Sequence, residues 1–256
     1  MANCKTWVAI WVAFLVAAAL GVAPALAQEK KQLLPGNFST NFGLYSDYTF
    51  RGISQTGNDP AVQGSIDWSI DTSMHGIGIY AGAWGSNVNL TDGDLEIDFY
   101  GGLTKTFGPV NAKAGFIYYR YPGARGSLNF DYVEGTVALS GEIYPGLTLG
   151  VSYNGSPNNF GDSGDAHYFN GGLSYAVPVK EVNLTLFGNV GRQMIQRNAV
   201  FGTPDYWDFK VGATLGLTKN LSLSAFYTDT DIDTAECSGG LNTCDGRFQA
   251  SLVAAF

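Results

Sequence analysis

The chain has 256 residues, of which 45% are hydrophobic and only 14% are charged, against about 25% charged residues in an average soluble domain. Glycine is abundant at 34 residues, and the formal net charge is −8. This composition excludes a disordered chain, a coiled coil and a basic nucleic-acid-binding protein, so we expect no nucleic-acid partner. It is typical of an all-β protein with little charge on its outer surface.

The first 27 residues have the pattern of a secretory signal peptide. Lys5 is their only charged residue, an apolar run follows over 7–16, and the segment ends in the small-x-small sequence Ala25-Leu26-Ala27. The apolar run is shorter than the ~20 residues that a membrane-spanning helix needs. We therefore predict cleavage after Ala27 and export of the mature chain, with a short periplasmic segment over 28–37 before the first strand.

Beyond residue 37, apolar and polar residues alternate with the period of two that is typical of strands with one apolar face. Most of these runs have ten or more residues, close to the ~9–11 residues of a transmembrane β-strand. The twelve predicted runs cover 38–51, 62–70, 76–87, 94–104, 110–121, 131–141, 146–155, 167–177, 181–191, 205–218, 220–229 and 247–256.

The connections between the runs alternate in length, with five short turns and six longer polar loops. This pattern predicts an all-β fold over 38–256: a transmembrane antiparallel up-and-down β-barrel of about 12 strands, with short periplasmic turns and longer external loops. The alternative is a soluble β-sandwich or lipocalin-like barrel, but its outer face would carry dense charge. The longer loops are expected near 52–59, 88–93, 122–129, 155–166, 192–204 and 230–246.

The first strand leads into the motif YSDYTFRGISQT at Tyr45–Thr56, which is followed by Asp59–Gly64. This segment resembles the opening motif of the TorF porin family, a proteobacterial family formerly catalogued as conserved proteins of unknown function. The resemblance implies an outer-membrane barrel with porin activity and names no substrate. Further matching segments are Tyr80–Trp84, Ser86–Val88, Leu95–Gly102, Tyr118–Gly123 and Tyr227–Ile232.

The last run ends in an apolar phase that places Phe248, Leu252 and the terminal Phe256 on one face. This pattern resembles the signal by which the outer-membrane assembly machinery recognises its clients. It predicts the bacterial outer membrane as the location, with its lipid bilayer and that machinery as partners.

The polar phase of the strands predicts which residues line the lumen. Asp94, Glu96 and Asp98 stand ~6.8 Å apart along one strand face. They are expected either to attract cations or to pair with Lys113 or Arg120 on the next strand. No histidine accompanies them, so we predict no cofactor and no metal site, with weak Ca²⁺ binding as the remaining alternative. The predicted pore-lining residues are Asp47, Arg51, Asp67, Asp94, Glu96, Asp98, Lys113, Glu134, Asp208 and Lys210.

Two functions fit a barrel of this size. Twelve strands enclose more space than an eight-stranded barrel filled by side chains. The first hypothesis is therefore a porin-like channel for passive diffusion of small hydrophilic solutes or ions, with a mild cation preference. The second is a non-conducting structural or surface-interaction barrel, its bore filled by the tyrosines of the polar phase, namely Tyr45, Tyr100, Tyr119 and Tyr121.

An enzyme is not expected. Of the two histidines, His75 falls in a predicted periplasmic turn and His167 begins a strand. Asp162, Ser163 and Asp165 lie close to His167 in sequence, but such residues usually form a turn.

Two further features concern the outer parts of the barrel. Cys237 and Cys244 lie close together in a Gly/Asn-rich loop of an exported chain, which predicts a disulfide that tightens one surface loop. Aromatic residues near strand ends are expected to form girdles at the lipid headgroups, with Trp84 as a candidate for the inner face. These residues are Tyr48, Phe50, Trp68, Trp84, Tyr118 and Trp207.

Overall fold

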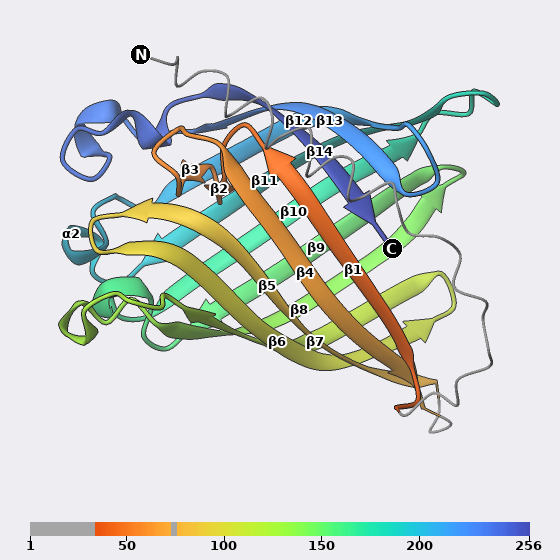
Figure 1. Ribbon diagram of the computed structural model, residues 1–256, viewed down its shortest axis with the longest axis horizontal. Helices are drawn as coiled ribbons and strands as arrows, with labels where there is room; N and C mark the ends of the chain where they lie inside the picture. Colours follow the sequence, from red (N-terminus) through yellow and green to blue (C-terminus); the bar gives the residue numbers. More distant parts are fainter. Residues whose placement is uncertain (1–33, 73–75) are drawn as a thin grey trace, which may run out of the picture. The chain divides into compact units, whose positions relative to one another are not determined.

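Twelve long antiparallel strands form a closed barrel in the computed structural model, which describes residues 34–72 and 76–256 (Figure 1). The barrel lies within the compact unit Gly36–Phe256. Its strands are β1 (Asn37–Tyr45), β4 (Ala61–Asp71), β5 (Ile77–Leu90), β6 (Gly93–Phe107), β7 (Val110–Arg120), β8 (Tyr132–Tyr144), β9 (Leu147–Ser156), β10 (Ala166–Ala176), β11 (Asn183–Ile195), β12 (Tyr206–Gly216), β13 (Leu221–Thr230) and β14 (Arg247–Ala255).

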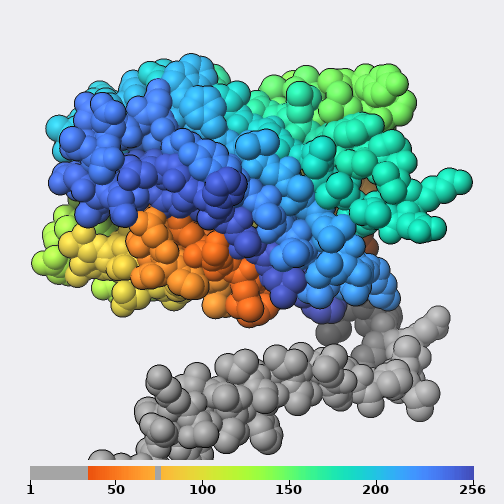
Figure 2. Space-filling view, turned by 90° about the horizontal axis from the view of Figure 1, so that it is seen from above, coloured from red at the N-terminus to blue at the C-terminus, as the bar shows by residue number. Residues whose placement is uncertain are grey.

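The first and last strands close the barrel. β1 pairs with β4 on one side and with β14 on the other, where Leu44 stands opposite Leu252. In Figure 2 the C-terminal part of the chain, in blue, lies against the orange N-terminal part of the barrel. Closure leaves no barrel strand with an unpaired edge, as a lipid environment demands. The predicted fold, an antiparallel up-and-down barrel of twelve strands, is confirmed.

The outer face of the barrel is apolar, because the alternating strands turn their large hydrophobic side chains outward. Every barrel strand contributes at least one exposed large hydrophobic residue, and a continuous apolar band of this kind matches a bilayer better than water. One such residue from each strand in order is Phe42, Ile66, Ile79, Phe99, Phe116, Val137, Val151, Phe169, Leu186, Val211, Leu223 and Leu252.

The connections gather at two ends. The long-loop end holds the segments 46–60, 91–92, 121–131, 157–165, 196–205 and 231–246, and the short-turn end holds the other five connections. The predicted loop at 88–93 is much shorter than expected, because β5 runs on to Leu90. The short helices lie at the left of Figure 1, and their bounds are η1 (Gly126–Leu128), η2 (Phe160–Asp162), α2 (Asn198–Phe201), η3 (Thr234–Glu236) and η4 (Asn242–Cys244).

The largest departure from the sequence prediction is Ser46–Pro60, which we call the inward segment. The predicted strand over 38–51 ends at Tyr45, and the chain then turns into the barrel. A two-stranded hairpin of β2 (Thr49–Phe50) and β3 (Ile53–Ser54) forms its tip. Arg51 and Gly52 take positive φ values of 49° and 82°, which stops the extended strand at this point.

Three predictions concern residues outside the described part of the chain. They are the signal peptide over 1–27, most of the segment 28–37, and His75 in its predicted turn. Within residues 34–72 and 76–256, no helix is long and apolar enough to span a membrane.

Candidate functional site in the barrel lumen

The inward segment reaches strands on several sides of the lumen. Its polar side chains bond to β6, β8, β11 and β14, so the segment lies across the long-loop end of the bore. Three of its residues make most of these bonds: Arg51 at the tip, Tyr48 beside β6, and Asp47 beside β14.

Arg51 is the most extensively bonded of the three. One guanidinium nitrogen lies 2.7 Å from a carboxylate oxygen of Glu134 on β8, and the other donates to the Gln193 side-chain oxygen on β11 at 2.7 Å. The guanidinium also stands 4.2 Å from the centre of the Tyr168 ring and 4.6 Å from that of Phe50. The side chains of Arg51 and Glu134 are only 8% and 1% exposed, so each charge depends on the other for neutralisation.

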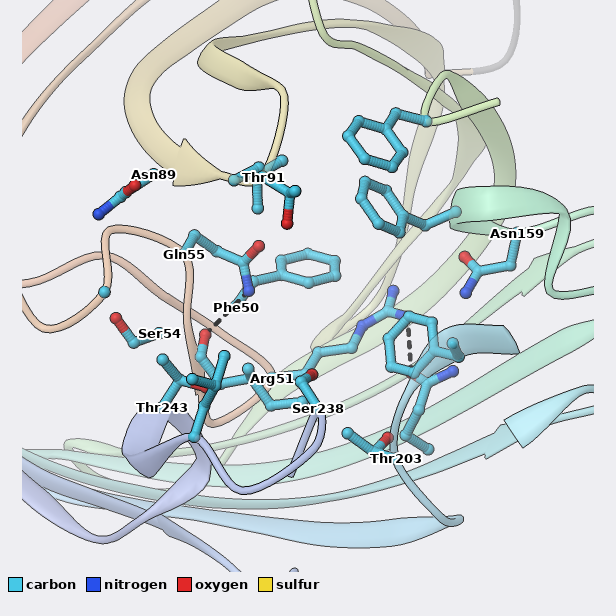
Figure 3. Close-up of a pocket in the computed structure, with 18 of the residues that line it drawn as sticks. Phe50, Arg51, Ser54, Gln55, Asn89, Thr91, Asn159, Thr203, Ser238 and Thr243 are labelled. Carbon is cyan, nitrogen blue, oxygen red and sulfur yellow. Dashed lines mark hydrogen bonds between the residues drawn. The ribbon is translucent and has the colours of Figure 1, made fainter. Parts of the chain in front are cut away.

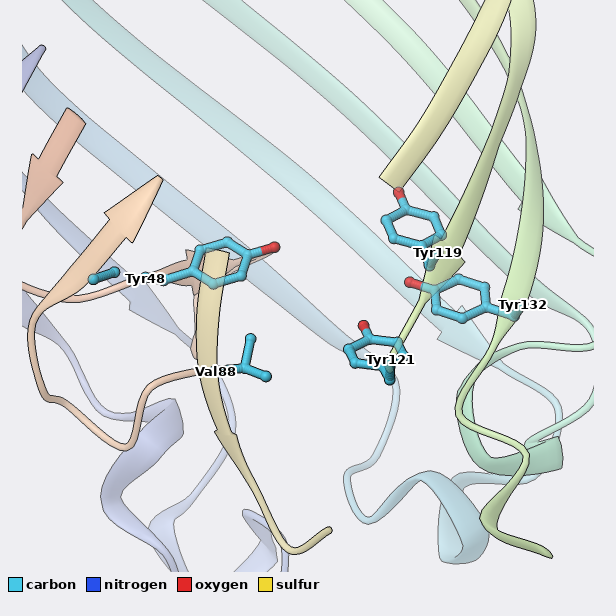
Figure 4. Packing of buried hydrophobic residues seen from close by; sticks show 6 residues of the cluster. Tyr48, Val88, Tyr119, Tyr121 and Tyr132 are labelled. Carbon is cyan, nitrogen blue, oxygen red and sulfur yellow. The ribbon is translucent and has the colours of Figure 1, made fainter. Parts of the chain in front are cut away.

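Tyr48 fixes the segment against β5 and β6. Its hydroxyl donates to Glu96 on β6 at 3.1 Å, and its ring packs edge-on against Trp84 of β5. Burial, and then the neighbouring Glu96, raise the pKa of the Tyr48 hydroxyl well above its usual range, so it stays a neutral donor. Figure 4 shows Tyr48 pointing toward three tyrosines across the lumen, Tyr119, Tyr121 and Tyr132.

Asp47 organises the base of the segment. Its carboxylate accepts hydrogen bonds from Ser54 and Thr56, both at 2.7 Å, which brings the two ends of the segment together. The same carboxylate pairs with Arg247 at 3.2 Å and accepts a bond from Gln249 at 3.2 Å. Both of these partners lie on β14, so Asp47 ties the segment to the strand that closes the barrel.

Two buried carboxylates beside the segment have an oxygen without a hydrogen-bond partner. These are Asp98 on β6, 8% exposed, and Asp208 on β12, 3% exposed. Close packing holds Asp208 in place, because a side chain at Gly191 would collide with its carboxylate and with Tyr168. Each of these oxygens is enclosed by protein, so it lacks a hydrogen-bond partner and has almost no accessible surface.

The carboxylates of β6 do not make the pairs considered from the sequence. Arg120 points outward and pairs with Asp131, while Lys113 lies over the Tyr80 ring, 4.1 Å from its centre. Asp94, at the start of β6, is exposed. Glu96 bonds to Tyr48, and Glu134 pairs with Arg51. The sequence did not suggest these partners, because Tyr48 and Arg51 both lie on the inward segment.

The remaining predicted lumen residues bond or pack between strands. Asp67 on β4 accepts a hydrogen bond of 2.5 Å from the Tyr100 hydroxyl. Lys210 on β12 stands over the Phe226 ring, 5.0 Å from its centre. These contacts join neighbouring strands or strands two apart, with no inserted segment between them.

A cavity of about 320 Å³ opens above the tip of the inward segment (Figure 3). Phe50 and Arg51 form part of its wall, and the rest comes from loops of the long-loop end, including Asn159 and Phe160, and from strand ends such as Tyr132 of β8. The volume lies within the ≈ 300–1,000 Å³ range of small-molecule sites. No pattern in the sequence indicated this cavity, since its wall combines loop residues far apart in the chain.

The disulfide, the C-terminal residues and the aromatic girdle were also predicted from the sequence. Cys237 and Cys244 form a disulfide, and Phe248, Leu252 and Phe256 are exposed along and just after the last strand. Their recognition by an assembly machinery stays a prediction. Tyr48 and Phe50 were wrongly assigned to a lipid-facing girdle, because the inward segment carries both into the lumen. Trp84 faces inward as well, whereas Tyr118 and Trp207 are exposed.

His167 bonds to a tyrosine and not to the acidic residues close to it in sequence. Its Nδ1 lies 2.8 Å from the Tyr153 hydroxyl, while Asp162 accepts hydrogen bonds from Asn129 and Asn158. Within the described ranges, no group of three or more His, Cys, Asp and Glu side chains is placed to hold a metal ion.

The family comparison decides where this barrel belongs. The sequence profile of a family described as "Bacterial protein of unknown function (Gcw_chp)" matches residues 29–256. The chain belongs to this family. A comparison with curated proteins gives no match.

Solved structures share the fold. A KdgM porin in complex with disordered oligogalacturonate is 8% identical, with a TM-score of 0.54 over 85% of this chain and 99% of that one. An outer membrane channel from Pseudomonas putida F1 is 11% identical, with a TM-score of 0.53 over 91% of this chain and 100% of that one. At such low identity the likeness establishes the barrel fold alone.

Proposed function

We propose that this protein is an outer-membrane channel through which small hydrophilic solutes or ions diffuse passively, with the inward segment as its narrowest part. The observation that carries the proposal is the meeting of charged side chains from this segment and from several strands inside a barrel with an apolar exterior. The similar porin and channel structures and the sequence resemblance to the TorF family support it.

We further propose a mild preference for cations. Carboxylates outnumber cationic groups around the inward segment, and two of the carboxylates keep an unpaired oxygen. Carboxyl oxygens that line a narrow bore favour the entry of cations. The groups compared are Asp47, Glu96, Asp98, Glu134 and Asp208 on one side and Arg51, Lys210 and Arg247 on the other.

The test is single-channel conductance of the refolded protein in a planar bilayer with a salt gradient. We expect steady unit currents with a cation-selective reversal potential, and a smaller preference when Asp94, Glu96 and Asp98 are all replaced by Asn. Asp98→Asn alone is the cleaner variant, since one oxygen of Asp98 has no partner, whereas Glu96 holds Tyr48. The matched control is Asp165→Asn at an exposed carboxylate before β10, which should leave the potential unchanged.

One observation favours a second function, a barrel that does not conduct and acts through its surface. Tyr48, Tyr119, Tyr121 and Tyr132 are all at least nine-tenths buried within the long-loop end of the bore. A protein that refolds as a barrel yet passes no current would contradict the channel and support this alternative. Unchanged reversal potentials in all the carboxylate variants would contradict the cation preference alone.

A further inference from the structure

The wall of the cavity above the inward segment includes a side-chain amide that bonds to no other group of the described residues. The Asn159 side chain belongs to a residue only 4% exposed, and it makes no hydrogen bond with any residue in 34–72 or 76–256. Its backbone is fixed, since its N–H donates to Gly164 and its carbonyl accepts from Ser163. Figure 3 shows the carboxamide directed into the same space as Phe50 and Arg51. Because the amide borders the cavity, its donor and its acceptor are both available to a ligand there.

The cavity wall offers no free charge to a ligand. Arg51 is the one charged residue among its lining residues, and both terminal nitrogens are engaged by Glu134 and Gln193. The ion pair with Glu134 cancels the charge of the guanidinium. A charged ligand would therefore enter without a counter-ion, at a high desolvation cost. The polar groups that remain are amides and hydroxyls, each able to bond a neutral ligand.

Aromatic rings supply the other part of the wall. Phe130 and Phe160 stack with ring centres 4.3 Å apart, and Tyr121 meets both of them edge-on. Phe50 faces the same cavity from the inward segment. Ring faces favour contact with the weakly polar C–H faces of a ligand, while the amides favour hydroxyls at its rim. A purely aromatic ligand would match the rings but leave Asn159 unpaired.

We propose that this cavity binds a neutral saccharide, with the Asn159 carboxamide as a central hydrogen-bonding partner. A sugar ring has hydroxyls around its rim and C–H groups on its faces, the combination that these walls complement. Binding needs no flux through the barrel, so this proposal can fail while the channel proposal holds, and the reverse is also true.

The experiment is isothermal titration of the refolded full-length mature chain in detergent with cellobiose and maltose as neutral probes. We expect saturable binding of at least one of them, and a loss of about tenfold in affinity for Asn159→Leu, equivalent to about 1.4 kcal/mol. Asn154→Leu is the matched control, because Asn154 lies on β9 outside the cavity wall and should bind as the unchanged protein does. Heat-modifiable electrophoretic mobility checks that each variant has folded.

Phe160→Leu provides a second variant if Asn159→Leu does not fold, and we expect it to weaken binding severalfold through loss of the ring face. No saturable binding of either disaccharide at about 10 mM, well above a Kd of about 1 mM, would overturn the proposal. Tighter binding of a digalacturonate or of benzyl alcohol would also overturn it, since the first is charged and the second has no hydroxylated ring. Equal affinity of the Asn159 and Asn154 variants would remove Asn159 from the site.

Discussion

The two ends of the lumen are built in different ways. At the short-turn end, contacts such as Tyr100 with Asp67 and Lys113 with Tyr80 join strands that are neighbours or nearly so. At the long-loop end, the inward segment joins strands far apart around the barrel, through Tyr48, Arg51 and Asp47. The first end gains its form from the strand ladder itself, whereas the second depends on a few long-range bonds.

Because of this difference, residues at the long-loop end can be altered while the barrel still folds. Strand pairing around the barrel is continuous, so the wall does not require the inward segment. The segment is fixed by a small set of charged and polar bonds, and a single substitution can remove each of them. Variants at each end can separate the contributions of the two ends, and removal of the inward segment is expected to have the largest effect.

Removing the inward segment should open the bore. Replacing residues 47–59 by a short Gly/Ser linker takes away Tyr48, Arg51 and the hairpin between them, while β1 and β4 keep their pairing. We expect unit conductance to rise at least about twofold, because the narrowest part of a pore dominates its resistance. Planar-bilayer recording measures this directly.

The control shortens another connection at the same end. Deleting Gly123–Gly126 removes an exposed loop whose Arg125 is 69% exposed and pairs with Asp92 outside the lumen. Its conductance should match that of the unchanged protein. An unaltered conductance after removal of the inward segment would show that the narrowest part lies at the short-turn end instead.

Arg51→Gln should have the next largest effect. It leaves Glu134 buried, 1% exposed, without its cation, which costs about 3–5 kcal/mol for a buried pair. We expect a lower free energy of unfolding in urea and a reversal potential shifted toward cations. The double variant Arg51→Gln with Glu134→Gln restores neutrality and should recover most of the stability. Equal stability of the single and double variants would contradict the role assigned to the ion pair.

The two ends also contain a matched pair of tyrosine–carboxylate bonds, which allows a direct comparison. Tyr48→Phe removes the donor to Glu96 from the inward segment, and Tyr100→Phe removes the donor to Asp67 between strands. Each loses a bond worth about 1–3 kcal/mol, but only the first loosens the segment. We expect extra conductance levels in recordings of Tyr48→Phe and none in those of Tyr100→Phe. Similar recordings from both variants would remove the distinction between the ends.

These contrasts also show what the sequence could and could not predict. The period-two alternation predicts the strands, the closed barrel and the inner face that contains Glu96, Asp98 and Asp208. It does so because successive side chains of a strand point to opposite faces. It fails at Tyr48 and Phe50, whose alternation continues that of β1 although the chain has turned inward. The turn depends on bonds from Asp47 and Arg51 to distant strands, and alternation within one segment carries no information about such partners. The Arg51-Gly52 pair was the local signal of a turn.

The smallest expected effect concerns the disulfide, whose closed loop bonds directly to the inward segment at Asn58. Asn242, within the loop closed by Cys237 and Cys244, accepts a hydrogen bond of 2.9 Å from Asn58, and its carbonyl accepts another from Arg247. The closed loop is short, so its contribution should fall below the ~3 kcal/mol of a 15-residue loop. Replacing both cysteines by Ser should leave barrel folding and mean conductance unchanged, while limited proteolysis cuts the loop faster. A conductance change as large as that of Tyr48→Phe would instead make this loop a principal support of the inward segment, and the long-range bonds from Asp47 and Tyr48 would no longer suffice to explain its position.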